Sequence, residues 1–466
     1  MTETNRHSQP FLMVFIATIT LILLSLFSTE INILGYQTKK VSPLIDILKL
    51  DKLRYSPLPL PIVNASLKTK DSTAIALRDI DPANIIDFKK GEETTLAHFF
   101  TALNELKQRK RKVRIGYFGD SMIEGDLITQ DVRECYQNTF GGDGVGYLPI
   151  TSIVAGFRTS ILHSFDGWTT YNLLDENTHG HLLGISGNGF VPATVALKEA
   201  DKSPSWVRYT AVNRKHLNRF PKTILLYGKS DDDNQVAING KLYKLNEKKT
   251  VNQLVINNVS ACQYMDARFL CKTPIDVFGF SIESDSGVFV DNFSFRGNSG
   301  LPISKVTQSV YSGTNDCLNY DLIILEYGLN VVNSRVTDFS WYVKGITNTI
   351  KHIQSSFPKA SILLISVGDK SYRKDGEYHT DPSVPILVSA QKEIAEKNNL
   401  AFWSLFDAMG GSESMVKWVE GDTVLANKDY THFNFKGAHK VGKLLYSKLM
   451  SEFNDYNKKQ TRLYNE

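Results

Sequence analysis

The sequence predicts an α/β protein in which a three-layer α/β/α domain with a parallel sheet is interrupted by an antiparallel β-sandwich. After residue 93, and again after residue 290, short apolar runs alternate with segments of helical periodicity, which is typical of a parallel sheet covered by helices. From about 145 to 290, short runs rich in Tyr, Phe, Val, Thr and Asn are separated by Gly, Asn and Asp, as in antiparallel sheets. A chain of 466 residues is also long enough for more than one core.

The first part of the chain predicts a membrane anchor and a linker. Residues 11–27 contain no charged residue and are mostly Leu, Ile and Phe. The length of this apolar segment is just enough to span a bilayer. No small-residue cleavage pattern follows, so an uncleaved signal anchor over 1–37, a transmembrane helix, is favoured over a cleaved signal peptide. We expect a single-pass protein of the cell membrane whose bulk is extracytoplasmic, in the periplasm. Residues 38–92 include SPLPLPIV, lack sustained periodicity and predict a linker.

The first part of the α/β domain is predicted for residues 93–145. A helix is expected over 94–110, because apolar residues recur there on one helical face, namely Leu96, Phe99, Phe100, Leu103 and Leu106. VRIGYFG at 113–119 is a short apolar run typical of a buried strand, and the segment 127–140 predicts the helix that follows it.

Residues 146–290 predict the inserted domain, a jelly-roll-like β-sandwich. ING at 238–240 lies between two alternating runs and is a hairpin turn signal. Such a module commonly carries loops that face saccharides, although a purely structural lid is also compatible with the pattern.

The α/β domain resumes over residues 291–466. Strands are predicted at 321–328, 360–368 and 400–408, and helices at 341–357, 384–399 and 433–453. In parallel sheets, functional groups gather where the strands end at their carboxyl side. Ser121 and Asn330 both lie at such positions.

Composition argues against several classes of partner. Hydrophobic residues make up 42% of the chain and charged residues 22%, as in a folded globular protein, and a net charge of +4 is too small to predict nucleic-acid binding. The four cysteines show no CxxC spacing and the HxH at 179–181 lacks a third ligand, so we predict no metal and no other cofactor. Cys262 and Cys271 predict either a disulfide in an oxidising compartment or two free thiols.

Two distant motifs carry the chemistry. GDS at 119–121 ends an apolar strand, and DYTH at 429–432 places a carboxylate three positions before an imidazole. A neutral serine is a poor nucleophile, so a histidine must take its proton and a carboxylate must orient that histidine. Alone, Ser121 could be a helix N-cap, His432 a capping or core histidine and Asp429 a helix cap. Together the three residues predict a Ser-His-Asp arrangement.

These motifs resemble the blocks of the SGNH, or GDSL-type, esterases and acyltransferases. GDS is similar to the first block, FSFRGNSG at 293–300 to the second, GLN at 328–330 to the third and DYTH to the last, in the order of the family. The resemblance covers about 113–140 and 288–453 and implies a flavodoxin-like catalytic domain. Here Val331 follows Asn330, where the family usually has an aspartate, and Met122 replaces the usual leucine.

The resemblance also implies roles for individual residues. Ser121 would be the nucleophile, His432 the general base and Asp429 the group that orients it. The backbone amides of Ser121 and Gly297 and the side chain of Asn330 would form the oxyanion hole, with no cofactor. Glycine at 297 is also expected because it lets the backbone approach closely without a Cβ.

Family members with an inserted β-sandwich resemble peptidoglycan and polysaccharide O-acetylesterases. The resemblance therefore implies removal of O-acetyl groups from a cell-envelope or other polysaccharide, with an acetylated glycan as the partner molecule. An O-acetyltransferase acting on a glycan and a non-catalytic glycan-binding protein are the alternatives. Glu124 and Asp126 are expected to complement a helix dipole, or else to line the site and disfavour strongly anionic substrates.

Overall fold

The computed structural model describes residues 84–89, 91, 93–193, 204–231, 233–259 and 262–465, and the backbone of two short paired strands, β1 (Asn32–Ile33) and β2 (Tyr36–Gln37). The chain divides into two units, Met1–Ala76 and Leu77–Glu466, and the second is described below. The predicted membrane segment at 11–27 lies outside the described residues. Within the described part, none of the helices has the length and apolar character needed to cross a bilayer.

A six-stranded sheet forms the centre of the α/β domain, in the order β16-β4-β17-β18-β21-β3. All neighbours pair in parallel except β3, which pairs antiparallel with β21. The strands are β3 (Ile86–Asp87), β4 (Lys112–Gly119), β16 (Gly287–Ser294), β17 (Leu322–Glu326), β18 (Ser361–Ile365) and β21 (Ala401–Trp403). Taken in chain order, the five parallel strands run 2-1-3-4-5, which is the flavodoxin-like order, so the predicted parallel sheet is confirmed.

Helices cover both faces of this sheet, which gives the three predicted layers. One layer contains α3 (Ala97–Gln108), α4 (Thr129–Phe140) and α10 (Phe435–Asn465), and the other contains α5 (Gln308–Leu318), α6 (Ser340–Ser356) and α7 (Ser383–Lys397). Shorter helices connect the strands to these layers, namely η1 (Ser121–Asp126), η2 (Pro302–Lys305), η3 (Leu329–Val331), α8 (Leu405–Met409) and α9 (Ser414–Glu420). Strands β17 and β18 are buried along their whole length because helices lie on both sides of them.

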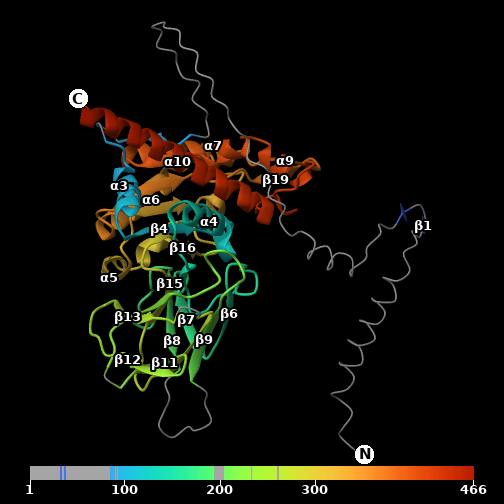
Figure 1. Ribbon diagram of the computed structural model, residues 1–466. Coiled ribbons are helices and arrows are strands. Elements are labelled where there is room, and N and C mark those ends of the chain that lie inside the picture. The colour runs from blue at the N-terminus through green and yellow to red at the C-terminus, as the bar shows by residue number, and fades with distance from the viewer. Residues whose placement is uncertain are drawn as a thin grey trace, which may run out of the picture. The chain divides into compact units, whose positions relative to one another are not determined.

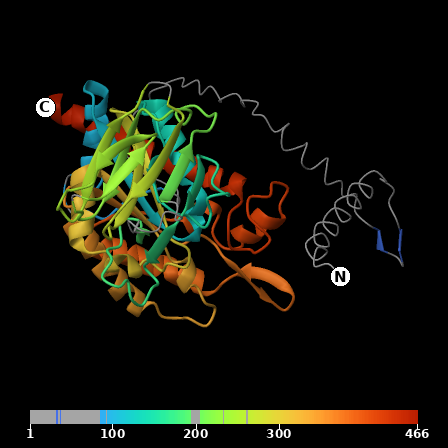
Figure 2. The same ribbon diagram turned by 90° about the horizontal axis from the view of Figure 1, so that it is seen from below.

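Several predicted boundaries in the α/β domain were wrong. The predicted strand at 400–408 ends at Trp403, because the Ser404 side chain accepts a hydrogen bond from the Asp407 amide and so caps the start of α8. The predicted linker, 38–92, includes β3 near its end, and β3 is a strand of the sheet. Helix α5 and the hairpin of β19 (Ser371–Lys374) and β20 (Glu377–Thr380) were not predicted. Figure 2 shows this hairpin projecting from the α/β domain.

The insertion is a two-sheet antiparallel sandwich, as predicted. One sheet has the order β13-β10-β15-β8-β7 with β5 on β15, and the other β12-β11-β14-β9-β6. With six and five strands it exceeds the eight of a jelly roll. The strands are β5 (Gly146–Leu148), β6 (Leu162–Asp166), β7 (Trp168–Asn172), β8 (Asn188–Pro192), β9 (Ser205–Thr210), β10 (Lys222–Tyr227), β11 (Gln235–Ile238), β12 (Lys241–Lys244), β13 (Asn252–Asn257), β14 (Tyr264–Leu270) and β15 (Val277–Glu283).

Local sequence explains the tightest turn of the sandwich. Strands β11 and β12 are joined by Asn239 and Gly240 alone, and both have positive φ, at 49° and 81°. This is the two-residue hairpin turn that Asn-Gly favours, so the predicted turn is confirmed. The four cysteines are free thiols, so Cys262 and Cys271 form no disulfide in this structure.

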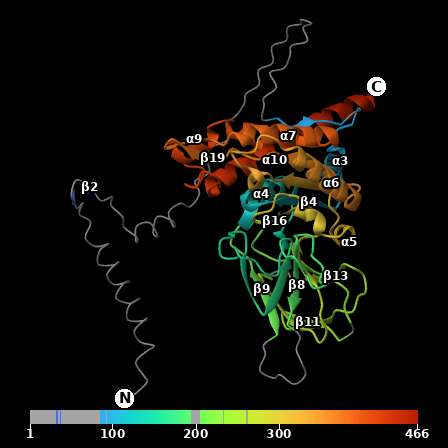
Figure 3. The ribbon, with the colours of Figure 1, turned by 180° about the vertical axis from the view of Figure 1, so that it is seen from behind.

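The sandwich and the parallel sheet are directly connected. Strand β15 ends at Glu283 in the sandwich, and β16 begins at Gly287 beside β4, a few residues before the predicted boundary at 290. Figures 1 and 3 show β4 and β16 next to the sandwich. Arg114 of β4 is buried and pairs with Asp291, at 2.6 Å, and with Glu283. A guanidinium with two carboxylate partners, all of them buried, therefore joins the two parts.

Candidate active site

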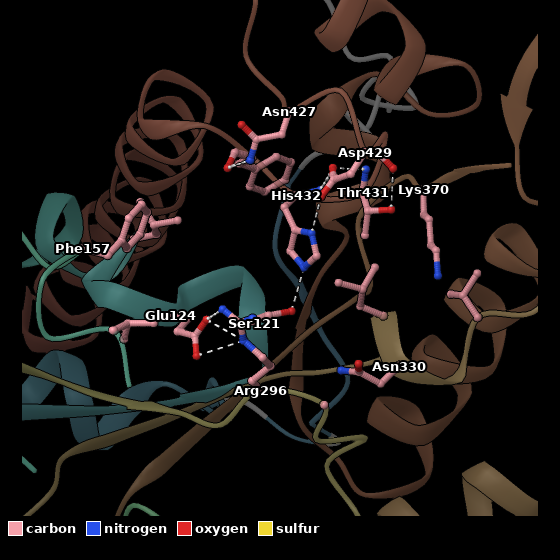
Figure 4. Close-up of a pocket in the computed structure, with 16 residues that line it drawn as sticks. Ser121, Glu124, Phe157, Arg296, Asn330, Lys370, Asn427, Asp429, Thr431 and His432 are labelled. Carbon is pink, nitrogen blue, oxygen red and sulfur yellow. Dashed lines mark hydrogen bonds and ion pairs between the residues drawn. The ribbon is translucent and has the colours of Figure 1, made fainter. Parts of the chain in front are cut away.

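Neighbouring strands of the parallel sheet each deliver one residue to the same edge. Ser121 follows β4, Gly297 follows β16 and Asn330 follows β17, in agreement with the rule for the carboxyl ends of parallel strands. His432 comes from the loop between α9 and α10. These residues line a pocket of about 830 Å³, shown in Figure 4.

Ser121, His432 and Asp429 form a continuous chain of hydrogen bonds (Figure 4). The Ser121 Oγ lies 2.8 Å from His432 Nε2, and His432 Nδ1 lies 2.8 Å from Asp429 Oδ2. With the Nδ1 proton directed to Asp429, the Nε2 lone pair faces the serine hydroxyl. The three residues that the sequence singled out are thus together, although 311 positions separate Ser121 from His432.

The loop that carries His432 is held in place at several points. Asp429 Oδ1 accepts hydrogen bonds from the backbone amides of Thr431 and His432, both at 3.0 Å. Burial acts to raise the pKa of Asp429, but the hydrogen bonds from His432 and Thr431 outweigh it and hold this pKa below its usual value. Tyr430 has a positive φ of 54°, and its ring stacks on Tyr378 of the β19–β20 hairpin with centroids 3.5 Å apart. The unpredicted hairpin therefore supports the loop that carries His432.

Asp120 explains why Ser121 is available. It is Asp120 that caps η1, because its side chain accepts a hydrogen bond from the Met122 amide at 3.0 Å. The alternative interpretation of Ser121 as a helix N-cap is therefore wrong. Burial raises the pKa of Asp120 to about 6, against the opposing effect of the Met122 amide.

The predicted oxyanion donors converge on the pocket, with two differences from expectation. Gly297 has a φ of 77°, and a Cβ built there meets no atom within 4 Å, so glycine is needed for its backbone conformation and not for space. No described residue accepts a hydrogen bond from the Gly297 amide. Asn330 Nδ2 donates to Asp120 Oδ2 at 3.1 Å and to the Asn298 carbonyl at 3.0 Å, so both of its protons are engaged in this arrangement.

The expectations for Glu124 and Asp126 are met only in part, since Glu124 does line the pocket. Both lie in η1, before α4 begins, so neither complements the dipole of that helix. Glu124 lines the pocket but is paired with the Arg296 guanidinium, with Nε 3.0 Å from Oε2. Asp126 is buried and accepts two hydrogen bonds from Arg133, at 2.7 and 2.8 Å.

Asp126 also fixes a loop of the insertion against the site. Arg158 and Ser160 donate to Asp126 Oδ2 at 3.1 and 2.6 Å. Between the strands β5 and β6, this loop carries Phe157, whose ring stacks on Phe435 of α10 with centroids 5.0 Å apart. Val154 and Phe157 line the pocket, so the sandwich supplies one wall of it.

Among the pocket residues that the sequence did not reveal are Phe157, Arg296 and Lys370. Lys370 follows β18, so the rule that identified Asn330 could have found it. Nothing in the sequence indicated Phe157, because its place depends on how the insertion packs on η1. In the described part of the chain, no three His, Cys, Asp or Glu side chains are grouped to hold a metal, and His181 instead contacts Asp276 at 2.7 Å.

Comparison with solved structures identifies the fold. A structure described as "Peptidoglycan O-acetylesterase in action" superimposes with a TM-score of 0.65 and 21% identity, over 80% of this chain and 99% of that one. This likeness shows that the two chains share their fold. Neither a protein-family model nor a curated protein matches the sequence.

Two other structures align more loosely. A family two carbohydrate esterase from Clostridium thermocellum has a TM-score of 0.27 and 12% identity, over 63% of this chain and 98% of that one. A salicylyl-acyltransferase from a tetracycline biosynthetic pathway has a TM-score of 0.28 and 13% identity, over 66% of this chain and 96% of that one. Neither alignment is close enough to carry an argument.

Proposed function

We propose that this protein is an SGNH-type serine esterase that removes O-acetyl groups from a cell-envelope or other polysaccharide, peptidoglycan-like in kind. The observation that carries the proposal is the hydrogen-bonded chain from Ser121 through His432 to Asp429, with 2.8 Å at each step. The fold likeness to a protein described as a peptidoglycan O-acetylesterase supports the substrate class.

In the first half of the reaction, the Ser121 Oγ attacks the acetyl carbonyl carbon while His432 Nε2 accepts the serine proton. Asp429, ionised at neutral pH, stabilises the imidazolium that forms. The bond from the carbonyl carbon to the sugar oxygen then breaks, and His432 returns the proton to that oxygen. The products are a free sugar hydroxyl and an acetylated Ser121.

In the second half, water attacks the acetyl-serine and loses its proton to His432, and the serine oxygen leaves with that proton as acetate is released. Both halves place a negative charge on the former carbonyl oxygen. The amides of Ser121 and Gly297 are suited to stabilise this charge, and one fixed donor of this kind is worth about 3 to 4 kcal/mol. The Asn330 side chain becomes a third donor to this oxygen when its hydrogen bond to Asp120 or to Asn298 is released or shared.

Replacement of the nucleophile tests the proposal. We expect Ser121→Ala to lower the rate of p-nitrophenyl acetate hydrolysis by several orders of magnitude, because no other hydroxyl faces His432 Nε2 in the described part of the chain. Ser355→Ala is the matched control, since Ser355 is exposed on α6. Equal rates for the wild type and Ser121→Ala would exclude Ser121 as the nucleophile.

A second assay separates the alternative functions. Incubation with acetylated glycans should release acetate, whereas an O-acetyltransferase would leave the acetyl group on an added glycan acceptor. A serine-directed fluorophosphonate should label the wild type and fail to label Ser121→Ala. A non-catalytic glycan-binding protein would show no labelling in either form.

We also propose that residues 1–37 anchor the protein in the cell membrane with Leu77–Glu466 on the extracytoplasmic side. The proposal rests on the uncharged apolar segment at 11–27. Proteolysis of intact spheroplasts should degrade the catalytic part, and its survival until the membrane is lysed would place it in the cytoplasm.

A further inference from the structure

Lys370 is a pocket residue whose charge is unmatched. It lines the same pocket as Ser121 and is partly buried. Among the residues that the structure describes, none forms an ion pair or hydrogen bond with its ammonium group. In Figure 4 the ammonium points into the pocket beside Thr431 and Asn330.

The other permanent cation of the pocket is matched. Arg296 pairs with Glu124, and Asp429 is hydrogen-bonded to the His432 ring. Because Glu124 is neutralised in this way, it does not make the pocket repel anions. Lys370 is thus the cation of the pocket that is left to interact with a ligand.

The backbone holds Lys370 in position. Its carbonyl accepts a hydrogen bond from the Asp381 amide at 2.8 Å, and the next amide, of Ser371, donates to the Tyr430 carbonyl at 3.0 Å. The preceding side chain, of Asp369, is buried and accepts hydrogen bonds from Thr380 and from the Met415 amide. Lys370 therefore extends from a rigid support that it shares with the loop carrying His432.

The sheet order fixes where this cation lies relative to the nucleophile. Ser121 follows β4 and Lys370 follows β18, with β17 between them. Two strand spacings amount to roughly 10 Å, a gap that the long lysine side chain partly closes. Phe157 lies on the opposite side of Ser121 in Figure 4.

We infer that Lys370 is a specificity-determining residue that binds a carboxylate carried by the substrate beside its acetyl ester, so that the preferred substrate is an anionic, carboxylate-bearing acetylated glycan. This inference rests on the proposed function. An ammonium group and a carboxylate form a charge-assisted hydrogen bond, which is stronger than the neutral bonds that sugar hydroxyls make.

Two small acetate esters of the same shape test the inference. 4-Acetoxybenzoate carries a carboxylate, and 4-acetoxybenzamide carries a neutral amide in its place. We expect the ratio of their kcat/KM values to fall about tenfold or more in Lys370→Met and to be retained in Lys370→Arg. Near-UV circular dichroism spectra and thermal unfolding midpoints equal to those of the wild type show that both variants remain folded.

Lys374→Met is the matched control. Lys374 is exposed on the β19–β20 hairpin, which begins directly after Lys370, and it does not line the pocket. Its ratio should equal that of the wild type. The same ratio in Lys370→Met as in the wild type would overturn the inference and leave the proposed esterase function intact.

Failure of the proposed function gives a different result. If the wild type hydrolyses neither of these esters nor p-nitrophenyl acetate, calorimetric binding of 4-hydroxybenzoate and 4-hydroxybenzamide decides the question. Preference for the benzoate in the wild type and its loss in Lys370→Met would still support the carboxylate site. Equal binding of both compounds by both proteins would overturn it.

Discussion

At the scale of single residues, Asp120 and Ser121 divide two tasks that the sequence could not separate. Both follow the buried strand β4, and either could have capped the short helix that begins there. Because the Asp120 carboxylate takes the Met122 amide, the Ser121 hydroxyl is left for His432. Asp120 also accepts a hydrogen bond from Asn330, so one buried carboxylate orders the residues on both sides of it.

This buried carboxylate predicts a specific pH dependence of stability. Burial raises the pKa of Asp120 from 3.8 to about 6. Between about pH 4 and pH 6 the folded state therefore holds a proton that the unfolded state has lost, and the stability of the wild type falls as the pH rises. Asp120→Asn lacks this titration. Its free energy of unfolding, relative to the wild type, should therefore increase by about 2 kcal/mol between pH 4 and pH 7.

Urea denaturation of both proteins at the two pH values measures this difference. An Asp120→Asn effect of equal size at pH 4 and pH 7 would mean that the carboxylate keeps an ordinary pKa. The comparison cancels buried acids that do not interact with Asp120, such as Asp369, whose pKa burial raises. Glu326 is not among them, because Asp120 contributes to raising its pKa.

At the scale of elements, the insertion takes part in the site through one loop. The segment between β5 and β6 lies over η1, where the Phe157 ring packs so closely on Gly125 that a Cβ there would come within 2.3 Å of it. Asp126 holds this loop through Arg158 and Ser160. The hairpin β19–β20 supports the loop of His432 in a similar way from the other side, through the Tyr378 and Tyr430 rings.

Removal of the Asp126 carboxylate should be strongly destabilising. In Asp126→Ala, the guanidinium groups of Arg133 and Arg158 would remain buried without their shared partner, which costs about 3 to 5 kcal/mol for a buried pair that loses one member. Chemical denaturation measures the loss. Asp231→Ala is the control, since both side chains of the Asp231–Lys248 pair are 66% exposed.

The pKa of Asp126 is held below its usual range, since Arg133 and Arg158 outweigh the opposing effect of burial. Its stabilising effect should therefore persist from neutral pH down to about pH 4, where the unfolded carboxylate begins to bind a proton. An Asp126→Ala protein as stable as the Asp231→Ala control would contradict the role of Asp126 as the anchor of the loop.

At the scale of the whole molecule, the α/β domain and the sandwich share a buried ionic junction. Arg114 of β4 joins Glu283 at the end of the sandwich to Asp291 of the parallel sheet, and the Tyr320 hydroxyl donates to the same Asp291 at 2.7 Å. Separation of the two domains would expose or orphan these charges, which is costly in a buried setting. The two domains should therefore not unfold independently.

Differential scanning calorimetry tests this expectation. The unit Leu77–Glu466 should unfold in one transition, with calorimetric and van't Hoff enthalpies that agree, although chains of this size with two cores often show several transitions. Arg114→Met, which removes the guanidinium, should lower the temperature of that transition. Two well-separated transitions in the wild type would show that the junction does not couple the domains.

The sequence by itself determined the architecture of this protein and the candidate residues Ser121, His432 and Asp429, which the structure brings into hydrogen-bond contact. Strands such as VRIGYFG and helices such as 384–399 follow from local periodicity, and a serine, a histidine and a carboxylate in ordered motifs are recognisable without coordinates. The predicted boundary at 290 falls inside β16, because the apolar pattern of β16 resembles that of β15 and membership of a sheet depends on the pairing partner.

The tertiary structure decided which residues surround the reacting groups. Lys370, Phe157 and Arg296 belong to the pocket only because the strand order, the anchored loop and the hairpin bring them there. It also decided that Asp120 and not Ser121 caps η1, and that Gly297 is needed for its positive φ. The physical reason is the same in each case: periodicity and propensity act between neighbours in the chain, whereas charge pairing, burial and the shape of a pocket arise between segments that only folding brings together.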